Sequence, residues 1–233
     1  MADLKNYRPM FILDPYKGTD FSGEWPTIPE MFNIGVKRCP DRPCFIDFAD
    51  DGTKRSFSYT EVRRDVLALA SFLVKQGLSK GDRVAVTGRN SPEWGTVFLA
   101  TLFAGGIICP IDWALGTDLQ ENLLATARPK FLFVDEDKYG HYASTSNDFR
   151  VFSLSPKQAE TYVYNLKAGG DQALPSADLE DTAAILFTSG TTSKPKGVML
   201  SHKNLVADCY TAQDNMKLYQ TDVFYKLLPI HHA

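Results

Sequence analysis

The composition of this 233-residue chain is that of an ordinary globular protein, with 44% hydrophobic and 23% charged residues, enough for a sizeable core. Its length allows one large domain or two small ones. A formal net charge of −3 without a basic stripe excludes the electrostatic footprint of a nucleic-acid-binding protein. The four cysteines show no Cys-x-x-Cys spacing, and three lie in or beside apolar segments, which indicates buried free thiols in a reducing cytoplasm.

No stretch of the sequence has the pattern of a targeting or membrane segment. Residues 1–18 lack the apolar core of a signal peptide. The longest apolar tract, 97–111, is broken by Gly105 and Gly106 and is too short to cross a bilayer as one helix. We therefore expect a soluble, cytoplasmic protein without a transmembrane segment.

After an irregular lead-in over residues 1–26, the sequence alternates between strand and helix patterns. A helix over 28–38 precedes a hairpin of two short strands at 45–48 and 55–59, and Thr60 is expected to cap the next helix. Further strands are expected at 83–87, 107–111, 131–134, 150–154, 183–187 and 223–228. Helices separate these strands except over residues 155–180, where the alternation is lost. This alternation predicts an α/β fold, a layered and mostly parallel sheet with helices on both faces.

The most informative stretch is 183–203, where a short apolar run leads into a loop of hydroxyl, glycine and lysine residues. Gly190 and Gly197 let the backbone turn with its N–H groups toward a ligand. A second apolar run, 198–200, is expected to be a buried strand, and Ser201 to cap a helix that ends near residue 218. Hydroxyl donors and two lysines in such a loop favour a polyphosphate.

Two other interpretations of this loop compete. An ordinary surface loop would also be rich in Gly, Ser and Thr, but it does not explain five hydroxyl residues and two lysines between two apolar runs. The P-loop of nucleotide hydrolases needs a second glycine, followed by lysine, after four intervening residues. Counting from Gly190, that position holds Pro195, so the P-loop pattern fails.

Residues 188–198, Thr-Ser-Gly-Thr-Thr-Ser-Lys-Pro-Lys-Gly-Val, resemble the phosphate-binding signature of the adenylate-forming superfamily: acyl-CoA synthetases, peptide-synthetase adenylation domains and luciferases. Ser193 stands where that family usually has glycine. Other family motifs follow in matching order: Phe-Ser-Tyr-Thr-Glu-Val at 57–62, Gly-Asp-Arg-Val-Ala-Val at 81–86, Asn-Ser-Pro-Glu-Trp at 90–94 and Ala-Gly-Gly-Ile-Ile-Cys-Pro-Ile-Asp at 104–112. To the first two we assign packing and no chemistry.

The resemblance covers residues 27–233, which we expect to be part of an AMP-binding domain, the N-terminal part of the large domain of an adenylate-forming enzyme. The family's later motifs and its C-terminal lid domain do not follow in this sequence. We therefore expect the chain to belong to a longer enzyme and to be inactive by itself.

The resemblance also implies a phosphate site, residue by residue. Lys196 would reach the β- and γ-phosphates and stabilise the departing pyrophosphate. Lys194 occupies the family's variable position and is expected to be a solvated surface lysine. The residues implied to cradle the phosphates, in addition to Lys196, are Thr188, Ser189, Gly190, Thr191, Thr192, Ser193 and Gly197.

A second catalytic residue is implied near the end of the chain. Leu-Pro-Ile-His-His at 228–232 resembles the family's Leu-Pro-x-x-His at a strand end, where ligands of open α/β sheets bind. His232 would then face the reacting carboxylate, while His231 falls where an aromatic is common. The competing interpretation is a merely hydrogen-bonded histidine, which is what we expect for His141 and His202.

The implied reaction has two steps. A carboxylate attacks the α-phosphorus of ATP to give an acyl-adenylate and pyrophosphate, and a thiol, most often that of coenzyme A, then takes the acyl group. The style of the motifs is most similar to long-chain fatty acyl-CoA synthetases. No metal-ligand cluster is visible in the sequence, so Mg²⁺ is expected only with the nucleotide. Alternatives are a carrier-protein thiol as acceptor, and a nucleotide-binding module or folding fragment without catalysis; the acid and the oligomeric state stay open.

Overall fold

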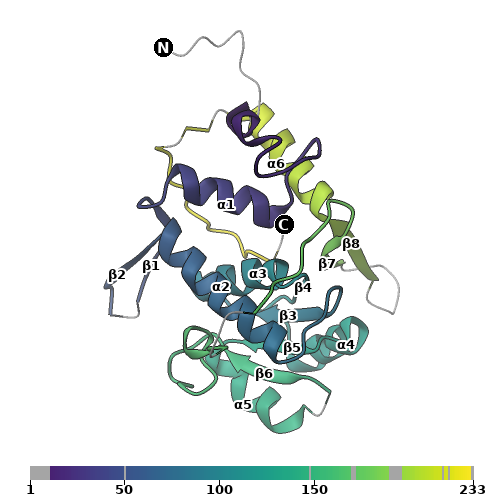
Figure 1. Cartoon of the computed structure of the whole chain (residues 1–233). Coiled ribbons are helices and arrows are strands. Elements are labelled where there is room, and N and C mark those ends of the chain that lie inside the picture. The colour runs from purple at the N-terminus through teal and green to yellow at the C-terminus, as the bar shows by residue number, and fades with distance from the viewer. Residues whose placement is uncertain are drawn as a thin grey trace.

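The computed structural model describes residues 11–49, 51–146, 148–168, 172–188, 196–216, 218–219 and 221–231. The order of elements follows the expected alternation (Figure 1). The helices are α1 (Ile28–Arg38), α2 (Tyr59–Lys75), α3 (Pro92–Phe103), α4 (Thr117–Ala127), α5 (Glu136–Thr145) and α6 (His202–Asn215), with short 3₁₀ turns η2 (Phe11–Tyr16) and η3 (Val163–Asn165). The strands are β1 (Pro43–Phe48), β2 (Lys54–Ser58), β3 (Arg83–Thr87), β4 (Ile107–Pro110), β5 (Phe131–Val134), β6 (Arg150–Ser153), β7 (Thr182–Thr188) and β8 (Lys196–Ser201).

Within the described residues the strands form two sheets. The larger has the order β6-β5-β3-β4-β7-β8. Its first five strands run parallel to their neighbours, and β8 returns antiparallel to β7. The predicted hairpin is confirmed as the antiparallel pair β1 and β2, which projects from the side of the molecule (Figure 1). The mostly parallel sheet predicted from the alternation is therefore confirmed.

Helices cover both faces of the large sheet, as predicted. Successive side chains of a strand point to opposite faces, and β3 divides its residues accordingly. Val84 and Val86 pack in a core with helices α1, α2, α3 and α6, whereas Ala85 packs in a second core with α4 and α5. Strand β5 does the same with alternate residues. The apolar runs at β3 and β5 are thus strands buried on both sides, as is usual in parallel sheets.

The N-cap of helix α2 lies two residues before the expected one. Its N-cap is Ser58, not Thr60: the Ser58 hydroxyl accepts from the backbone N–H of Glu61, whose carboxylate accepts from the Ser58 N–H at 2.8 Å. This reciprocal pair satisfies two backbone donors that a helix start leaves open. Thr60, already inside the helix, donates its hydroxyl to the Pro40 carbonyl at 3.0 Å. The Ser-Tyr-Thr-Glu motif is therefore a capping box. Ser58, and not Thr60, is the N-cap because Glu61 lies three residues after Ser58.

The lead-in contributes to the core. Leu13 and Phe21 are buried in the same cluster as α1, α2 and α3. The Trp25 ring packs edge-on against Tyr210 of α6, with ring centroids 4.9 Å apart, and Figure 1 shows the lead-in beside α6. Of the cysteines, which are free thiols, Cys109 is buried and the other three are partly exposed. Among the described residues, no helix is both long and apolar enough to cross a membrane.

Two strand predictions near the C-terminal end are wrong. Residues 223–228 form no strand, and their apolar side chains are exposed, Tyr225 by 87%. Strand β8 forms as expected but is not buried, since Val198 is 45% and Met199 68% exposed. An apolar run is buried only where other elements cover it, and β8 lies at the edge of the sheet with β7 as its neighbour. Helix α6 ends at Asn215, before residue 218.

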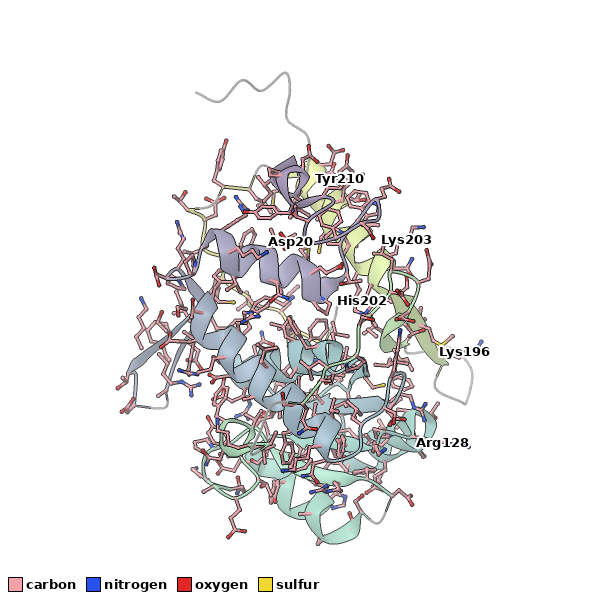
Figure 2. All side chains as sticks on the ribbon, viewed as in Figure 1. Asp20, Arg128, Lys196, His202, Lys203 and Tyr210 are labelled. Atoms are coloured by element: carbon pink, nitrogen blue, oxygen red, sulfur yellow. The ribbon has the colours of Figure 1, made fainter. Side chains whose placement is uncertain are left out.

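His202 joins three segments at the start of α6 (Figure 2). Its ring is 2% exposed, and Nδ1 accepts a hydrogen bond from the backbone N–H of Ile28 at 3.3 Å. The backbone N–H of His202 donates to the backbone carbonyl of Asp181 at 3.1 Å. Burial lowers the pKa of His202, while the Asp181 carboxylate acts weakly in the opposite direction and Lys80 adds to the lowering. His202 is thus a hydrogen-bonded core histidine that folds in its neutral form.

We predict that His202 makes the free energy of unfolding fall in mild acid. A folded-state pKa below the ordinary 6.5 means that the stabilisation is complete above that pH and is lost as the pH falls below it. His202→Asn keeps an acceptor for Ile28 and cannot be protonated. Urea unfolding between about pH 7.5 and about pH 5 should give a shallower pH dependence for this variant than for the wild type.

The matched control is His141→Asn. His141 pairs with Glu121 at 2.7 Å in an exposed position, where solvent screens the interaction, so this variant should retain the wild-type slope. Equal slopes for wild type and His202→Asn would contradict the prediction.

Candidate functional site

The carboxyl ends of the parallel strands lie along one edge of the sheet, the edge at which open α/β sheets bind ligands. Ile108 of β4 pairs with Ala184 of β7, so Asp112 and Thr188 each follow that pair by four residues. Asn90 follows β3 at the same edge, since β3 runs parallel to β4. Residues far apart in the sequence therefore come together here.

The phosphate-loop signature lies in the hairpin that joins β7 to β8. Thr188 is paired with Lys196 across the two antiparallel strands, so the two ends of the signature stretch that the structure describes lie opposite each other. Directly opposed residues of an antiparallel pair project from the same face. Thr188 and Lys196 are both exposed, and Figure 2 shows Lys196 at the end of β8. One hydroxyl and one ammonium group therefore stand together at the base of the loop.

Gly197 does not turn the backbone as expected, while its assignment to the phosphate site stays a prediction. It lies in β8, paired with Phe187, and is not among the glycines with positive φ, so it does not turn the backbone. A Cβ atom at this position would lie 2.7 Å from Cγ2 of Ile185 and 3.5 Å from the Phe187 ring. Glycine is required because the neighbouring strand's side chains lie across it.

The remaining predicted loop and histidine residues cannot be placed. Ser189, Gly190, Thr191, Thr192, Ser193 and His232 lie outside the described residues. Their assigned roles stay predictions, as does the catalytic role of Lys196. Of the predicted site, the structure brings together Thr188, Lys196 and Gly197 at one strand end.

His231, the neighbour of His232, is held at the carboxyl edge. Its side chain is 5% exposed, and Nε2 lies 3.3 Å from Oδ1 of Asp112, which follows β4. The Asp112 carboxylate is itself held in place, because its Oδ1 accepts from the backbone N–H of Ala114 at 2.8 Å. The pair forms an ion pair whenever His231 is protonated. The segment that ends at His231, called the histidine segment below (residues 221–231), is thus held at the end of the central strand β4.

Asn90 makes a second anchor. Its Oδ1 accepts from the backbone N–H of Ile230 at 2.7 Å, and its Nδ2 donates to the carbonyls of Lys226 at 3.2 Å and Leu228 at 2.9 Å. These three backbone groups belong to alternate residues, the spacing with which extended chain presents groups to one side. The Asn90 amide thus satisfies part of the backbone of this segment, in which residues 223–228 form no strand.

A charged network joins the ends of β3, β4 and β5. The Arg89 guanidinium lies 5.0 Å from the centroid of the Trp113 ring, within the range of a cation–π interaction, and the Arg89 N–H donates to Asp135 at 2.6 Å. Burial raises the pKa of Asp135. Lys138 donates to the carbonyls of Trp113 and Leu115 at 2.6 and 2.7 Å, and burial lowers its pKa. These contacts fix the loops that border the site.

The sequence gave no functional role to Asn90 or Asp112, and His231 was assigned to a position where an aromatic is common. The available signal was positional. Asn90 comes three residues after the end of β3, and Asp112 two residues after the end of β4. Polar residues directly after parallel strands lie at the ligand-binding edge, and this criterion would have found both.

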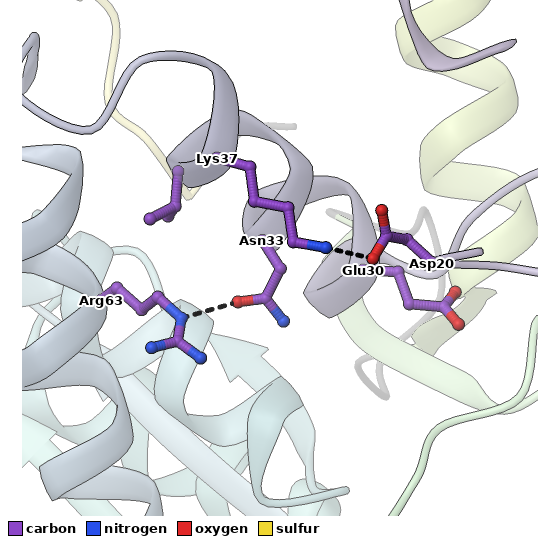
Figure 3. A pocket seen from close by; sticks show the side chains of 6 residues that line it. Asp20, Glu30, Asn33, Lys37 and Arg63 are labelled. Atoms are coloured by element: carbon purple, nitrogen blue, oxygen red, sulfur yellow. Dashed lines mark hydrogen bonds and ion pairs between the residues drawn. The ribbon is translucent and has the colours of Figure 1, made fainter. Parts of the chain in front are cut away.

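A hollow of about 360 Å³ lies elsewhere, over α1 and α2 (Figure 3). Its charged side chains have partners: Lys37 forms an ion pair with Asp20, Arg63 Nε donates to Asn33 Oδ1 at 2.9 Å, and Glu30 accepts from the backbone N–H of Thr27 at 2.6 Å. The lining residues are Asp20, Glu30, Asn33, Val36, Lys37 and Arg63. Because neither the loop hairpin nor the histidine segment contributes to it, we assign this hollow no part in the candidate site.

A mostly parallel sheet covered on both faces, with the loop hairpin at its carboxyl edge, is the architecture of the adenylate-forming enzymes. The fatty acid AMP ligase of Legionella pneumophila shares this fold with a TM-score of 0.76 at 21% identity, over 90% of this chain and 36% of that structure. The chain belongs to the AMP-binding enzyme family, whose profile matches residues 32–233.

Two relatives show the range of that family. The crotonobetaine/carnitine–CoA ligase of Salmonella arizonae is 29% identical over 204 residues, 82% of this chain and 40% of the relative. A polyketide synthase–nonribosomal peptide synthetase of Aspergillus clavatus is 31% identical over 208 residues, 84% of this chain and 5% of that protein. The chain thus spans less than half the length of either relative.

The close approach at Gly197 gives a stability prediction. Gly197→Ala should destabilise the protein by about 1–3 kcal/mol, the usual penalty for forcing an extra methyl group into occupied space. The control is Gly140→Ala in α5, where an added Cβ meets nothing within 4 Å and where alanine should stabilise by about 0.5–1 kcal/mol. Urea unfolding of both variants measures the difference, and a stabilised Gly197→Ala would contradict the assigned contact.

Proposed function

We propose that this chain carries the phosphate loop and the carboxylate-facing edge of an ATP-dependent acid–thiol ligase that proceeds through an acyl-adenylate. The observation that carries the proposal is the pairing of Thr188 with Lys196 at the base of the signature loop. Membership of the AMP-binding family supports it. In this proposal residues 27–233 form part of one AMP-binding domain.

In the first step, a carboxylate oxygen attacks the α-phosphorus of ATP. The new bond joins that oxygen to phosphorus, and the bond to the β-phosphate oxygen breaks, so pyrophosphate leaves with the electron pair. Lys196 would compensate the charge on the departing phosphates. The hydroxyls of Thr188 and the loop residues would position the phosphates for in-line displacement, with Mg²⁺ entering on the nucleotide.

In the second step, a thiol attacks the acyl carbon and AMP leaves. Coenzyme A is the acceptor that we propose, with support from the relative named as a CoA ligase. A carrier-protein thiol is the alternative, supported by the relative in a polyketide synthase–nonribosomal peptide synthetase. For the acid we propose a fatty acid, on the similarity of residues 228–232 to the motif of long-chain synthetases.

The direct test is ATP–pyrophosphate exchange by the intact protein with a panel of carboxylic acids that includes fatty acids of several lengths. Exchange that depends on one acid class supports adenylation and identifies the substrate. Coenzyme A and a carrier protein, added separately, then distinguish the acceptors. Absence of exchange with every acid tested would contradict the proposed activity.

We predict that Lys196→Ala slows ATP–pyrophosphate exchange by roughly ten- to a thousand-fold, the effect of removing one group that stabilises transition-state charge. The matched control is Lys194→Ala, two residues earlier in the same stretch, at the position that varies in the family. This control should keep an exchange rate near that of the wild type. An unchanged rate in Lys196→Ala would remove Lys196 from the catalytic machinery.

A second prediction concerns His232, assigned to the acyl side of the site. His232→Ala should raise the KM for the carboxylate or lower kcat by roughly ten- to a hundred-fold, the range for one positioned polar group, with little change in the KM for ATP. Steady-state kinetics with each substrate varied in turn measure the split. Loss of ATP affinity with normal carboxylate kinetics would contradict the assignment.

A further inference from the structure

The segment 221–231 reaches the carboxyl edge of the sheet without strand pairing of its own. Its residues up to Leu228 are exposed, and it has no regular secondary structure. His231, at its end, is nevertheless buried beside Asp112. Something other than a ladder of backbone hydrogen bonds must therefore fix the path of this segment.

Asn90 meets that requirement. Its side-chain amide makes three hydrogen bonds to this segment, one to an N–H and two to carbonyls, all between 2.7 and 3.2 Å. The bonded groups belong to Lys226, Leu228 and Ile230, so the contact extends over five residues of backbone. A single amide can do this because it offers an acceptor oxygen and two donor hydrogens.

The position of Asn90 makes it a firm base for such a contact. It lies between β3 and α3, and Ser91 directly after it caps α3 by accepting from the Trp94 N–H at 3.1 Å. The backbone N–H of Arg89 directly before it donates to Asp135 at 2.6 Å. Asn90 is therefore flanked by a helix cap on one side and by a bond to the residue after β5 on the other.

We infer that Asn90 is a positioning residue that holds the segment 226–231, and with it His231, against the carboxyl edge of the sheet. It acts through backbone groups of that segment and does not itself touch substrate. The role in catalysis rests on the proposed function, because the segment is assigned there to the acyl side of the site. The structural half of the inference stands on the three hydrogen bonds.

The test compares Asn90→Ala, Asn90→Asp and wild type in the intact protein. The first readout is hydrogen–deuterium exchange of peptides covering 222–231, with trypsin cleavage after the exposed Lys226 as an independent measure. Asn90→Ala should raise both rates roughly tenfold, since local opening of the segment becomes easier. Asn90→Asp keeps the acceptor for the Ile230 N–H but loses both donors, so its rates should fall between the other two.

The matched control is Asn165→Ala. Asn165 of η3 also bonds a backbone carbonyl, that of Ala159 at 2.9 Å, but it lies far from this segment in the sequence. It should leave exchange and cleavage of 222–231 at wild-type rates. Asn90 is exposed, so its variants should also keep the wild-type midpoint of thermal unfolding.

The second readout is steady-state kinetics. Asn90→Ala should raise the KM for the carboxylate about tenfold, as misplacement of a positioning group does, and leave the KM for ATP unchanged. Unaltered exchange and cleavage in Asn90→Ala would overturn the inference, whatever the activity. An opened segment with equal effects on both substrates would overturn the positioning role. A wild type without any adenylation would refute the proposed function, while exchange and cleavage would still decide whether Asn90 holds the segment.

Discussion

The parallel alignment of β3, β4 and β7 is the constraint on which the candidate site depends. Parallel strands end at the same edge, and each needs a crossover through a helix to return. The helices that provide those crossovers also supply the two cores that bury the sheet on both faces. As a result, Asn90, Asp112 and Thr188, which are separated by long stretches of sequence, lie along one edge. The antiparallel strand β8 then closes the loop hairpin beside them.

Charge and hydrogen bonding at this edge divide into two parts. On one side, Thr188 and Lys196 are exposed and available to a ligand at the base of the signature loop. On the other side, His231, Asp112 and Asn90 hold a segment that has no strand partner. An adenylating enzyme has to bring a polyphosphate and a carboxylate together in line. In the proposed function, the loop side would take the phosphate groups and the opposite side the acid.

Much of the fold was predictable from local pattern. The runs at 84–86 and 131–134 are continuous in apolar residues because both faces of these strands are buried, and such runs are recognisable from the sequence alone. Ser91-Pro92 predicted the start of α3 and Ser201 that of α6, and both serines are N-caps. The loop signature predicted the family. These features depend on residues a few positions apart, so the sequence contains the whole of their cause.

The sequence by itself therefore determined the α/β class, the starts of α3 and α6 and the family, while the tertiary structure alone decided exposure, pairing and the full composition of the site. The sequence predicted a strand at 223–228, but a strand forms only beside a neighbouring strand. Here the Asn90 side chain bonds the backbone carbonyls of Lys226 and Leu228 instead. The sequence predicted Gly197 as a turn residue, yet glycine is required there because the Ile185 side chain of the neighbouring strand leaves no room for a Cβ atom. The meeting of His231 with Asp112 joins positions more than a hundred residues apart. Local sequence carries no record of such contacts, because they arise only when crossovers bring the strand ends together.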